Sequence, residues 1–503
     1  MSNHLYDALF GPHEGRETPF LILPDGRTIT HAAFLARAAQ LAHALRAAGL
    51  RPGDRVALQL DKSAEMLAVI AGAIGAGVIF LPLNTAYTPA EVSYFITDAG
   101  ARLLLVDPAR IGMLAEVASA AGVPLMSLGT DGGGEFGALA AAQERRFATE
   151  PRAANDLAAF LYTSGTTGRS KGAMLSHGNL LSNAEVLARE WRFTADDILL
   201  HALPIFHTHG LFVATNVALI AGAGMIFLPK FDADEVIRLL PRATAMMGVP
   251  TFYTRLLSDP RLDRALTGHM RLFISGSAPL LAETHRDWQA RTGHRVLERY
   301  GMTETNMNTS NPYEGDRRAG TVGRALPGVE VKVCDAAGAE LPRGEVGVIE
   351  VRGPNVFRGY WRMPDKTREE LREDGFFITG DLGTMSEDGY VTIVGRAKDL
   401  VISGGFNVYP KEVEEMIDAL PGVVESAVVG VPHPDFGEAV VAVVVPAATD
   451  GTSPDAIRAA LQGQLAKFKQ PKHVEMRAEL PRNTMGKVQK ALLRSELKDL
   501  FRP

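Results

Sequence analysis

Apolar residues recur at helical spacing in some stretches of the first 107 residues and form short continuous runs in others. Residues 30–49 show the three- to four-residue spacing of an amphipathic helix that ends at a glycine, and residues 55–60, after a Pro-Gly-Asp turn, are typical of a strand. Residues 89–100 begin with a proline at a favoured first-turn position, and the apolar run 101–107 follows. This alternation predicts an α/β fold with a largely parallel sheet.

The apolar stretch 66–83 reaches the length of roughly 18 residues that a membrane-spanning helix needs. Gly72, Gly75 and Gly77 lie inside it, before a β-favouring run that contains Pro82. We therefore expect a buried helix, a glycine turn and a buried strand, and no membrane partner.

The same alternation resumes at about residue 156 and continues to residue 300. Strand-like runs at 159–163, 272–276 and 296–300 each lead into a polar or glycine-containing loop. Ligands of parallel α/β sheets usually bind at such strand ends, so we expect the site there.

Beyond about residue 320, short β-like runs broken by Gly and Pro predict a small antiparallel or β-barrel-like subdomain. After residue 398, helix-like and strand-like segments, with a second helix near residues 454–467, predict a compact α+β unit of about 105 residues. We expect a large N-terminal domain, residues 1–394, made of two parallel-sheet α/β subdomains and the small β subdomain. Residues 395–398 would join it to a small C-terminal α+β domain, residues 399–503.

The composition narrows the class of protein. A chain of 503 residues is too long to fold around a single hydrophobic core, so at least two domains are expected. Its apolar fraction of 46% is that of a globular protein. A net charge of −6 gives no attraction for nucleic acid, so that partner is not expected. The single cysteine, Cys334, suits a reducing cytosol and is expected to fill a strand. The N-terminus lacks a basic start followed by an apolar run, so we predict no secretory signal and a cytoplasmic location.

The segment YTSGTTGRSKGAML, residues 162–175, directly follows an apolar strand. Its glycines allow close backbone approach, its amide N–H groups can form an anion nest, and Arg169 or Lys171 can offset charge, so ATP phosphates are the expected guest. A flexible surface loop would leave the buried strand and the paired cations unexplained. The residues expected to bind ATP here are Thr163, Ser164, Gly165, Thr166, Thr167, Gly168 and Lys171.

A P-loop NTPase requires a glycine, four further residues and then Gly-Lys-Ser/Thr. Here Gly165 is followed by Ser170, Lys171 and Gly172, so the second glycine and the magnesium-binding hydroxyl are both missing. The spacing argues against a kinase or a GTPase.

The segment instead resembles the phosphate loop of the superfamily of acyl-CoA synthetases, non-ribosomal adenylation domains and luciferases. Segments similar to that superfamily's other signatures follow in order along nearly the whole chain: ALPIFHTHG (202–210), ISGSAPL (274–280), RYGMTE (299–304), TGD (379–381), GRAKDLVISGGFNVYP (395–410) and PRNTMGK (481–487). The resemblance implies an enzyme that uses ATP and Mg²⁺ to adenylate a carboxylic acid, releases pyrophosphate and passes the acyl group to coenzyme A.

The resemblance also implies residue roles. Thr303 should contact the α-phosphate and Glu304 should hold Mg²⁺; with His207 and Lys487 they form the expected catalytic set. Taken alone, Glu304 could be a solvated loop acid and Asp381 a turn residue before Gly383, and only the ordered set of signatures points to a site. The further ATP contacts are implied at Ser277, Ala278, Pro279, Glu298, Tyr300 and Gly301 beside the adenine, and at Asp381 and Arg396 beside the ribose.

Lys487 lies near a basic C-terminus, where a lysine usually marks a solvated helix face. The resemblance implies that it reaches the acyl and phosphate oxygens, and that a protein acetyltransferase can silence it by removing its charge. It further implies that residues 395–398 form a hinge and that the C-terminal domain is mobile. When this domain turns about Lys398, it would withdraw Lys487 and present Gly404, Gly405 and Phe406 to coenzyme A.

Arg299 stands where many relatives that activate monocarboxylates have a small uncharged residue. Its planar, permanently charged fork suits a carboxylate, so we expect a second carboxylate on the substrate, beside His207, Thr208 and Met307. Together, LERYGMTE and LPIFHTHG resemble the malonyl-CoA synthetases of the superfamily. That resemblance implies malonate, or its methyl derivative, as the acid.

Two structural alternatives stay open. Arg299 could pair with an internal acid such as Glu298 or Asp316. His201, His207 and His209 could form a metal site, although no cysteine or carboxylate spacing supports one.

Three functional alternatives share the expected fold. They are another short-chain acyl-CoA synthetase, a stand-alone adenylation enzyme that loads a carrier protein, and a luciferase-like oxygenase. A catalytically silent nucleotide-binding protein would be expected to lack Lys171, Glu304, Asp381 or Lys487, and all four are present.

Overall fold

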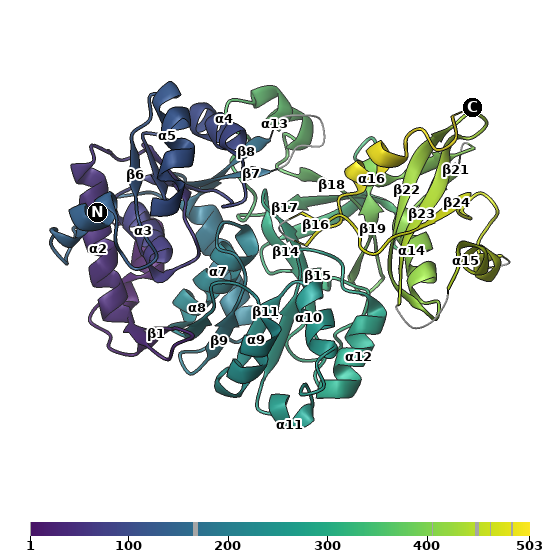
Figure 1. Cartoon of the computed structure of the whole chain (residues 1–503), viewed down its shortest axis with the longest axis horizontal. Helices are drawn as coiled ribbons and strands as arrows, with labels where there is room; N and C mark the ends of the chain where they lie inside the picture. The colour runs from purple at the N-terminus through teal and green to yellow at the C-terminus, as the bar shows by residue number, and fades with distance from the viewer. Residues whose placement is uncertain are drawn as a thin grey trace.

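Two largely parallel β-sheets form the frame of the N-terminal part of the chain (Figure 1). The computed structural model describes residues 2–163, 170–404, 406–447, 452–462, 464–483 and 486–502. The first sheet has the strand order β6 (Leu125–Ser127), β5 (Leu103–Val106), β3 (Arg55–Gln59), β4 (Ile79–Pro82), β7 (Leu157–Thr163) and β8 (Lys171–Ser176). The second sheet has the order β15 (Arg324–Ala325), β14 (Asn306–Ser310), β13 (Leu297–Met302), β12 (Leu272–Ser275), β11 (Ala245–Gly248), β9 (Ile198–His201), β10 (Gly224–Phe227), β1 (Pro19–Ile22) and β2 (Thr28–Thr30).

Helices pack on both faces of the two sheets, as the alternating pattern predicts. A shared apolar core contacts both sheets and contains α1 (His4–Leu9), α2 (His31–Ala47), α3 (Ala64–Gly75), α7 (His177–Glu190) and α8 (Asn216–Ala221). A second core packs α4 (Pro89–Ala99) and α5 (Ile111–Ala120) on the other face of the first sheet. A third packs α9 (Ala233–Leu239), α10 (Pro250–Leu257) and α12 (Ala282–Thr292) on the second sheet. Two short helices complete this part, α6 (Glu135–Ala141) and α11 (Arg264–Thr267).

The apolar stretch 66–83 folds as predicted, into the helix α3, a turn and the buried strand β4. Gly77 in the turn has a φ of +65°, and a Cβ there would lie 2.5 Å from Nε of Arg152, so only glycine fits. No helix among the described residues has both the length and the apolar character needed to cross a bilayer.

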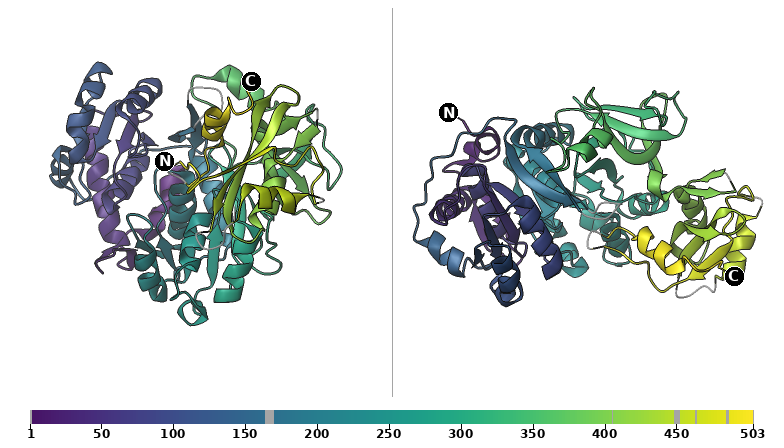
Figure 2. Two further views of the ribbon diagram at one scale, coloured as in Figure 1. Left: turned by 45° about the vertical axis from the view of Figure 1, so that its right-hand side comes forward. Right: turned by 90° about the horizontal axis from the view of Figure 1, so that it is seen from above.

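The later part of the chain builds two sheets of its own, one antiparallel and one mixed, which Figure 2 shows beside the largely parallel ones. The third sheet contains β16 (Glu330–Cys334), β17 (Gly347–Arg352), β18 (Phe377–Met385) and β19 (Val391–Arg396) in that order, with α13 (Pro364–Glu370) between β17 and β18 in sequence. Cys334 is buried at the end of β16, as predicted.

The fourth sheet forms a C-terminal lobe. Its path is β21 (Phe406–Val408), β20 (Val401–Ser403), β23 (Gly437–Pro446) and β22 (Val423–His433), and β24 (His473–Met476) pairs with β23. It carries α14 (Pro410–Asp418), α15 (Pro454–Leu461) and α16 (Lys490–Leu497). The helix predicted near 454–467 is therefore shorter than expected, because Gln462 already has an extended backbone with ψ of 129°.

Direct contacts join the C-terminal lobe to the rest of the molecule. Lys411 at the start of α14 donates from Nζ to the carbonyl oxygen of Ile393 in β19, at 2.7 Å. A Cβ at Gly486 would lie 3.6 Å from Oγ1 of Thr251 in α10. The turn that contains Lys487 therefore packs against the second parallel sheet's helices.

Candidate active site

The predicted phosphate-binding segment connects two antiparallel strands at the edge of the first sheet. β7 and β8 pair so that Thr163 lies opposite Lys171. The structure thus places the two ends of the segment side by side. The predictions for the residues between them lie outside the described residues: Ser164, Gly165, Thr166, Thr167 and Gly168.

The ammonium group of Lys171 lies in a polar cluster at the end of α13. Its Nζ is 3.1 Å from each carboxylate oxygen of Glu370 and 4.1 Å from the centre of the Tyr360 ring. Tyr360 Oη lies 2.6 Å from Oε2 of Glu370 and 3.0 Å from Oε1 of Glu304. Lys171 is therefore connected through two side chains to the predicted magnesium ligand.

Thr303 and Glu304 occupy the turn between β13 and β14. The Glu304 residue is only 5% exposed, and burial raises the pKa of its carboxyl group, opposed by Tyr360 and Lys171. Mg²⁺ takes oxygen ligands and is usually held by one or two carboxylates together with substrate phosphates. A buried carboxylate that feels the charge of Lys171 fits that ion.

Asp381 and Arg396, predicted beside the ribose, face each other across β18 and β19. Arg396 Nε lies 2.6 Å from Oδ1 of Asp381, and Tyr300 Oη donates to Oδ2 at 2.5 Å. Burial and then the Asp381 charge raise the pKa of Tyr300 well above its ordinary value, so the phenol keeps its proton. These bonds tie the third sheet to β13 of the second.

The loop after β12 contains Ser277, Ala278 and Pro279. Ser277 has a φ of +72°, and its Oγ lies 3.1 Å from Nδ1 of His209. Glu298, buried in β13, accepts a hydrogen bond from the Leu280 amide at 3.1 Å, and burial raises its pKa to about 7. A side-chain-bearing residue held at positive φ is strained, and such strain gathers at functional sites.

Arg299 lies inside β13, as the strand-like run 296–300 predicts. It is 3% exposed, and its Nε and Nη2 are buried without a hydrogen-bond partner. Burial lowers its pKa to about 9, so it stays charged at neutral pH. Among the described residues it takes part in no ion pair: Glu298 accepts a hydrogen bond from the Leu280 amide, and Asp316 pairs with Arg295 and Arg318. The alternative of an internal acid partner is therefore wrong.

Gly276, which the sequence analysis passed over, makes room for this guanidinium. A Cβ at Gly276 would lie 2.4 Å from Cζ and 2.5 Å from Nη1 of Arg299. The glycine follows β12 directly, so the strand end and the arginine are fitted to each other. Its place inside the segment ISGSAPL was the only signal in the sequence.

His207, Thr208 and His209 lie at the start of a π-helical turn, His209–Thr215, and both histidines feel the charge of Arg299. Burial, and then Lys487 and Arg299, lower the pKa of His207 to about 3, and burial followed by Arg299 lowers that of His209 well below its usual value. Both imidazoles are neutral. Nε2 of His209 and Oγ1 of Thr208 are buried without a partner, like the Arg299 nitrogens.

Met307 lies on β14, opposite Gly301 of β13. It is 2% exposed, and its Cε would be 2.5 Å from a Cβ at Gly301. The glycine thus provides the space that the methionine side chain fills. This places the predicted pocket residue directly against the signature strand.

The alternative of a metal site built from three histidines is wrong. Nδ1 of His201 is 3.0 Å from Nζ of Lys62, and its Nε2 is 2.8 Å from the carbonyl oxygen of Gly210. Both ring nitrogens are therefore occupied, and no cluster of His, Cys, Asp or Glu in the described ranges is arranged to hold a metal. His201 instead anchors the turn that carries His207 and His209.

Lys487 reaches across from the C-terminal lobe to this cluster. Much of the residue remains in contact with solvent, yet its pKa is lowered, first by the protein atoms that displace solvent and then by Arg396. Asp381 and Glu304 oppose that shift, and Arg299 adds to it. The ammonium therefore lies among the predicted ribose, magnesium and acid residues.

The other predicted residues of the C-terminal lobe lie at its surface. Lys398 is exposed in a short 3₁₀ turn, Ala397–Asp399, between β19 and β20. Gly404 has a φ of +60°, Gly405 lies outside the described residues, and Phe406 is 57% exposed and stacks on Phe468. The structure does not bring this loop together with Arg299 and Glu304.

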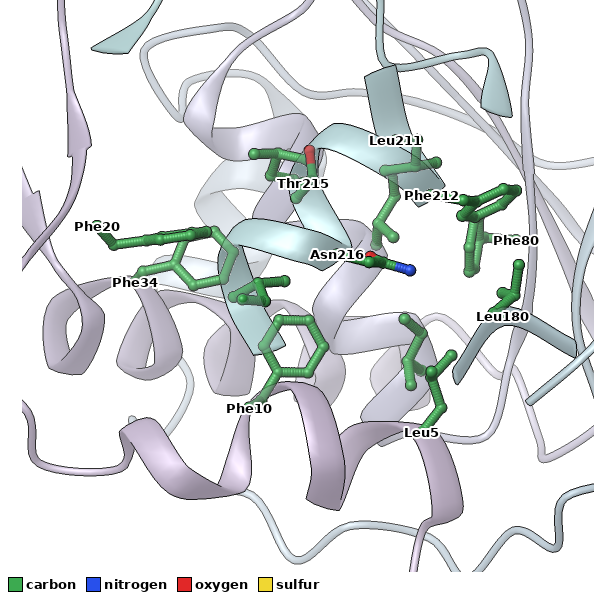
Figure 3. Close-up of a pocket in the computed structure, with 14 residues that line it drawn as sticks. Leu5, Phe10, Phe20, Phe34, Phe80, Leu180, Leu211, Phe212, Thr215 and Asn216 are labelled. Carbon is green, nitrogen blue, oxygen red and sulfur yellow. The ribbon is translucent and has the colours of Figure 1, made fainter. Parts of the chain in front are cut away.

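A small apolar cavity in the N-terminal part is a packing defect rather than a second site (Figure 3). Its volume is about 20 Å³, room for about one water molecule. Phe10, Phe34 and Phe80 line it, and Thr215 and Asn216 supply its few polar atoms.

The sequence matches two families of known proteins. Residues 12–361 match the AMP-binding enzymes, and residues 412–487 match the C-terminal domain of AMP-binding enzymes. The fold is similar to the crystal structure of ATP-bound MatB from Rhodopseudomonas palustris, with a TM-score of 0.98 and 59% identity over the full length of both chains.

Curated relatives are similar over most of the chain. Malonate--CoA ligase from Arabidopsis thaliana is 35% identical over 484 residues, which cover 90% of this chain and 79% of the relative. Sulfoacetate--CoA ligase from Cupriavidus necator is 36% identical over 484 residues, which cover 95% and 94%. Both relatives join an acid to coenzyme A, and the two acids differ.

The environment of Lys487 predicts how its amine titrates. We expect a pKa below the ordinary 10.5, a rise in the Arg396→Gln variant and a further fall in the Asp381→Asn variant, because the first loses a repelling charge and the second an attracting one. Competitive labelling of the amines with acetic anhydride across a pH series, read by mass spectrometry, measures it. An unshifted pKa that neither variant moves would place Lys487 outside this site.

Proposed function

Because the chain belongs to the family of AMP-binding enzymes and is an AMP-forming acyl-CoA synthetase, we propose that its acid is a small dicarboxylate, with malonate as the first choice and methylmalonate as the second. ATP and the acid react to give the acyl adenylate and pyrophosphate. Coenzyme A then displaces AMP to give the thioester. The choice of malonate follows the malonate--CoA ligase among the relatives. Other relatives, such as the sulfoacetate--CoA ligase, act on different acids.

The buried guanidinium of Arg299 carries the proposal. A buried charge without a partner destabilises a protein by about 3–5 kcal/mol, so a site that retains one is built for a ligand of opposite charge. Nε and Nη2 are the two unpartnered nitrogens, and adjacent guanidinium nitrogens bind a carboxylate in bidentate fashion. Nε2 of His209, whose ring feels the charge of Arg299, and Oγ1 of the neighbouring Thr208 are further buried polar atoms without a partner.

The size of the acid follows from the position of Arg299. Tyr300 and Glu304 lie one and five positions beyond Arg299 in sequence, and we assign them to the ribose and magnesium ends of the site. An acid with one carboxylate on Arg299 and the other at the α-phosphate therefore has a short spacer. A long acyl chain would bring apolar surface to a buried charge, which is unfavourable.

The adenylation step brings two anions together, a carboxylate and the α-phosphate, so charge must be neutralised at the point of attack. We propose that Lys487 does this from the C-terminal lobe, with Thr303 donating to the same phosphate and His207 bordering the acid. Lys487 brings the positive charge that this step needs. His207 has a pKa of about 3 and is neutral, so it carries no charge that could hold the acid in place of Arg299.

The nucleotide would lie along the residues already connected. Ser277, Ala278, Pro279, Glu298, Tyr300 and Gly301 are proposed for the adenine, Asp381 and Arg396 for the ribose, and Thr163, Lys171 and the segment between them for the phosphates. Glu304 is the proposed protein ligand of Mg²⁺, an ion that neutralises phosphate charge when bound.

Thioester formation needs a second arrangement, because Phe406 is exposed at the surface whereas Arg299 is buried. We propose that the C-terminal domain, residues 399–503, turns on the hinge 395–398 relative to residues 1–394. Lys398 would be the pivot, and the loop of Gly404, Gly405 and Phe406 would then meet coenzyme A. The hydrogen bond from Lys411 to Ile393 is one of the contacts that must break.

Two further proposals concern the cell. Lys487 keeps contact with solvent and a lowered pKa, which favours the free amine that an acetyltransferase modifies. We propose that acetylation there abolishes adenylation, and that the enzyme works in the cytoplasm.

A panel of acids tests the choice of substrate. AMP release with acetate, malonate, methylmalonate, succinate and octanoate should be fastest with malonate, followed by methylmalonate, because only a short dicarboxylate reaches both Arg299 and the α-phosphate. In the Arg299→Ala variant, KM for malonate should rise about 100-fold and KM for ATP much less, the signature of a lost ground-state contact. Equal turnover of acetate and malonate by the wild type would contradict the proposal.

A variant of Lys487 separates the two half-reactions. Lys487→Ala should lower acid-dependent formation of the adenylate by about 100-fold or more, since it removes charge from the point of attack. Thioester formation from supplied malonyl-AMP should persist, since Lys487 is withdrawn in that step. Rapid-quench measurement of each half-reaction gives both numbers, and equal loss in the two would show that Lys487 has a different role.

A further inference from the structure

The carboxylate of Glu370 occupies the place where Lys171 would otherwise offer its charge. Both of its oxygens are 3.1 Å from Nζ of Lys171. The side chains are only 16% and 22% exposed, so water screens this pair less than it screens a surface pair. A phosphate that approaches Lys171 therefore meets a cation that is already neutralised.

Glu370 has a second cation to return to. Nζ of Lys366, one turn earlier on α13, lies 3.0 Å from Oε1 of Glu370. If Lys171 moves to a phosphate, the carboxylate keeps Lys366 and the Tyr360 hydroxyl as partners. Exchange of Lys171 between the two anions leaves no buried charge uncompensated, so its free-energy cost is small.

Tyr360 connects this exchange to Glu304. Its hydroxyl lies between the two carboxylates, at 2.6 Å from Glu370 and 3.0 Å from Glu304, and has a single hydrogen to donate. The Lys171 ammonium lies over the face of the same ring at 4.1 Å, a favourable cation–π position. The ring therefore holds Lys171 and Glu370 in register with the other end of the phosphate site.

We propose that Glu370 is a positioning residue that competes with the polyphosphate for Lys171 and so weakens the binding of ATP and pyrophosphate. When the phosphates are absent, Glu370 holds the lysine in place. When pyrophosphate has formed, recapture of Lys171 by Glu370 favours its release. The proposal rests on the proposed phosphate role of Lys171 and is independent of which acid is activated.

The test compares Glu370→Gln with Glu369→Gln in the full chain. Both remove one negative charge from α13, but the side chain of Glu369 is 64% exposed, and its ion-pair partner among the described residues is Lys366, at 2.8 Å. Calorimetric titration with inorganic pyrophosphate and with MgATP, without any acid, should show Kd about three- to tenfold lower in Glu370→Gln, the range expected for a freed, partly buried cation. Glu369→Gln should stay within about twofold of wild type.

Two further variants keep the test decisive. In a Lys171→Met background, Glu370→Gln should have no added effect on either Kd, because the two residues then share one interaction. Glu370→Asp, which keeps the charge, should bind pyrophosphate as wild type does, and thermal unfolding checks that each variant is folded. Unchanged or weaker binding in Glu370→Gln, equal tightening in Glu369→Gln, or tightening that survives in Lys171→Met overturns the proposal. Loss of malonate turnover alone, with these results intact, would refute the choice of acid and leave this role of Glu370 standing.

Discussion

Arg299 carries a positive charge into the interior of the N-terminal part, on β13, where no acidic side chain among the described residues pairs with it. Neighbouring residues are shaped around this charge. Gly276 gives the guanidinium its space, Ser277 accepts a strained backbone to reach His209, and both histidines beside it are neutral. A second cation there would add repulsion to a site that already lacks an anion, so the histidines release their protons instead.

The other charged side chains of the site differ in whether they have an ion-pair partner. Lys171 is neutralised by Glu370 in the described structure, and Arg396 is neutralised by Asp381. Arg299 and Lys487 have no such ion-pair partner among the described residues, and they come from opposite sides of the site. One is fixed in a strand and the other is carried by the C-terminal lobe, which bonds to β19 through Lys411. A fixed cation suits recognition of the acid, whereas a movable one suits a step that must later be undone.

Sequence reasoning reached the elements whose patterns are local. The helix, glycine turn and strand of residues 66–83 and the capped helix at Pro89 follow from spacing, glycine and proline alone. It also reached Arg299, because this arginine stands in the segment RYGMTE where many relatives have a small uncharged residue. It missed Gly276, Tyr360 and Glu370, since a steric fit and an ion pair spanning 199 positions leave no periodic trace in the chain. The helix near residue 454 was drawn too long because composition does not show where an extended residue ends it.

The proposed choice of acid depends on Arg299 binding the second carboxylate of the substrate. The most direct measurement is kcat/KM for malonate against malonamate, its isosteric mono-amide, in the wild type and in Arg299→Gln. We predict a preference for malonate of about 100-fold or more in the wild type, because the amide leaves the buried guanidinium without a counter-charge, and a preference close to one in the variant. A wild-type enzyme that uses the two acids equally well, or a variant that keeps the full preference, would contradict the account.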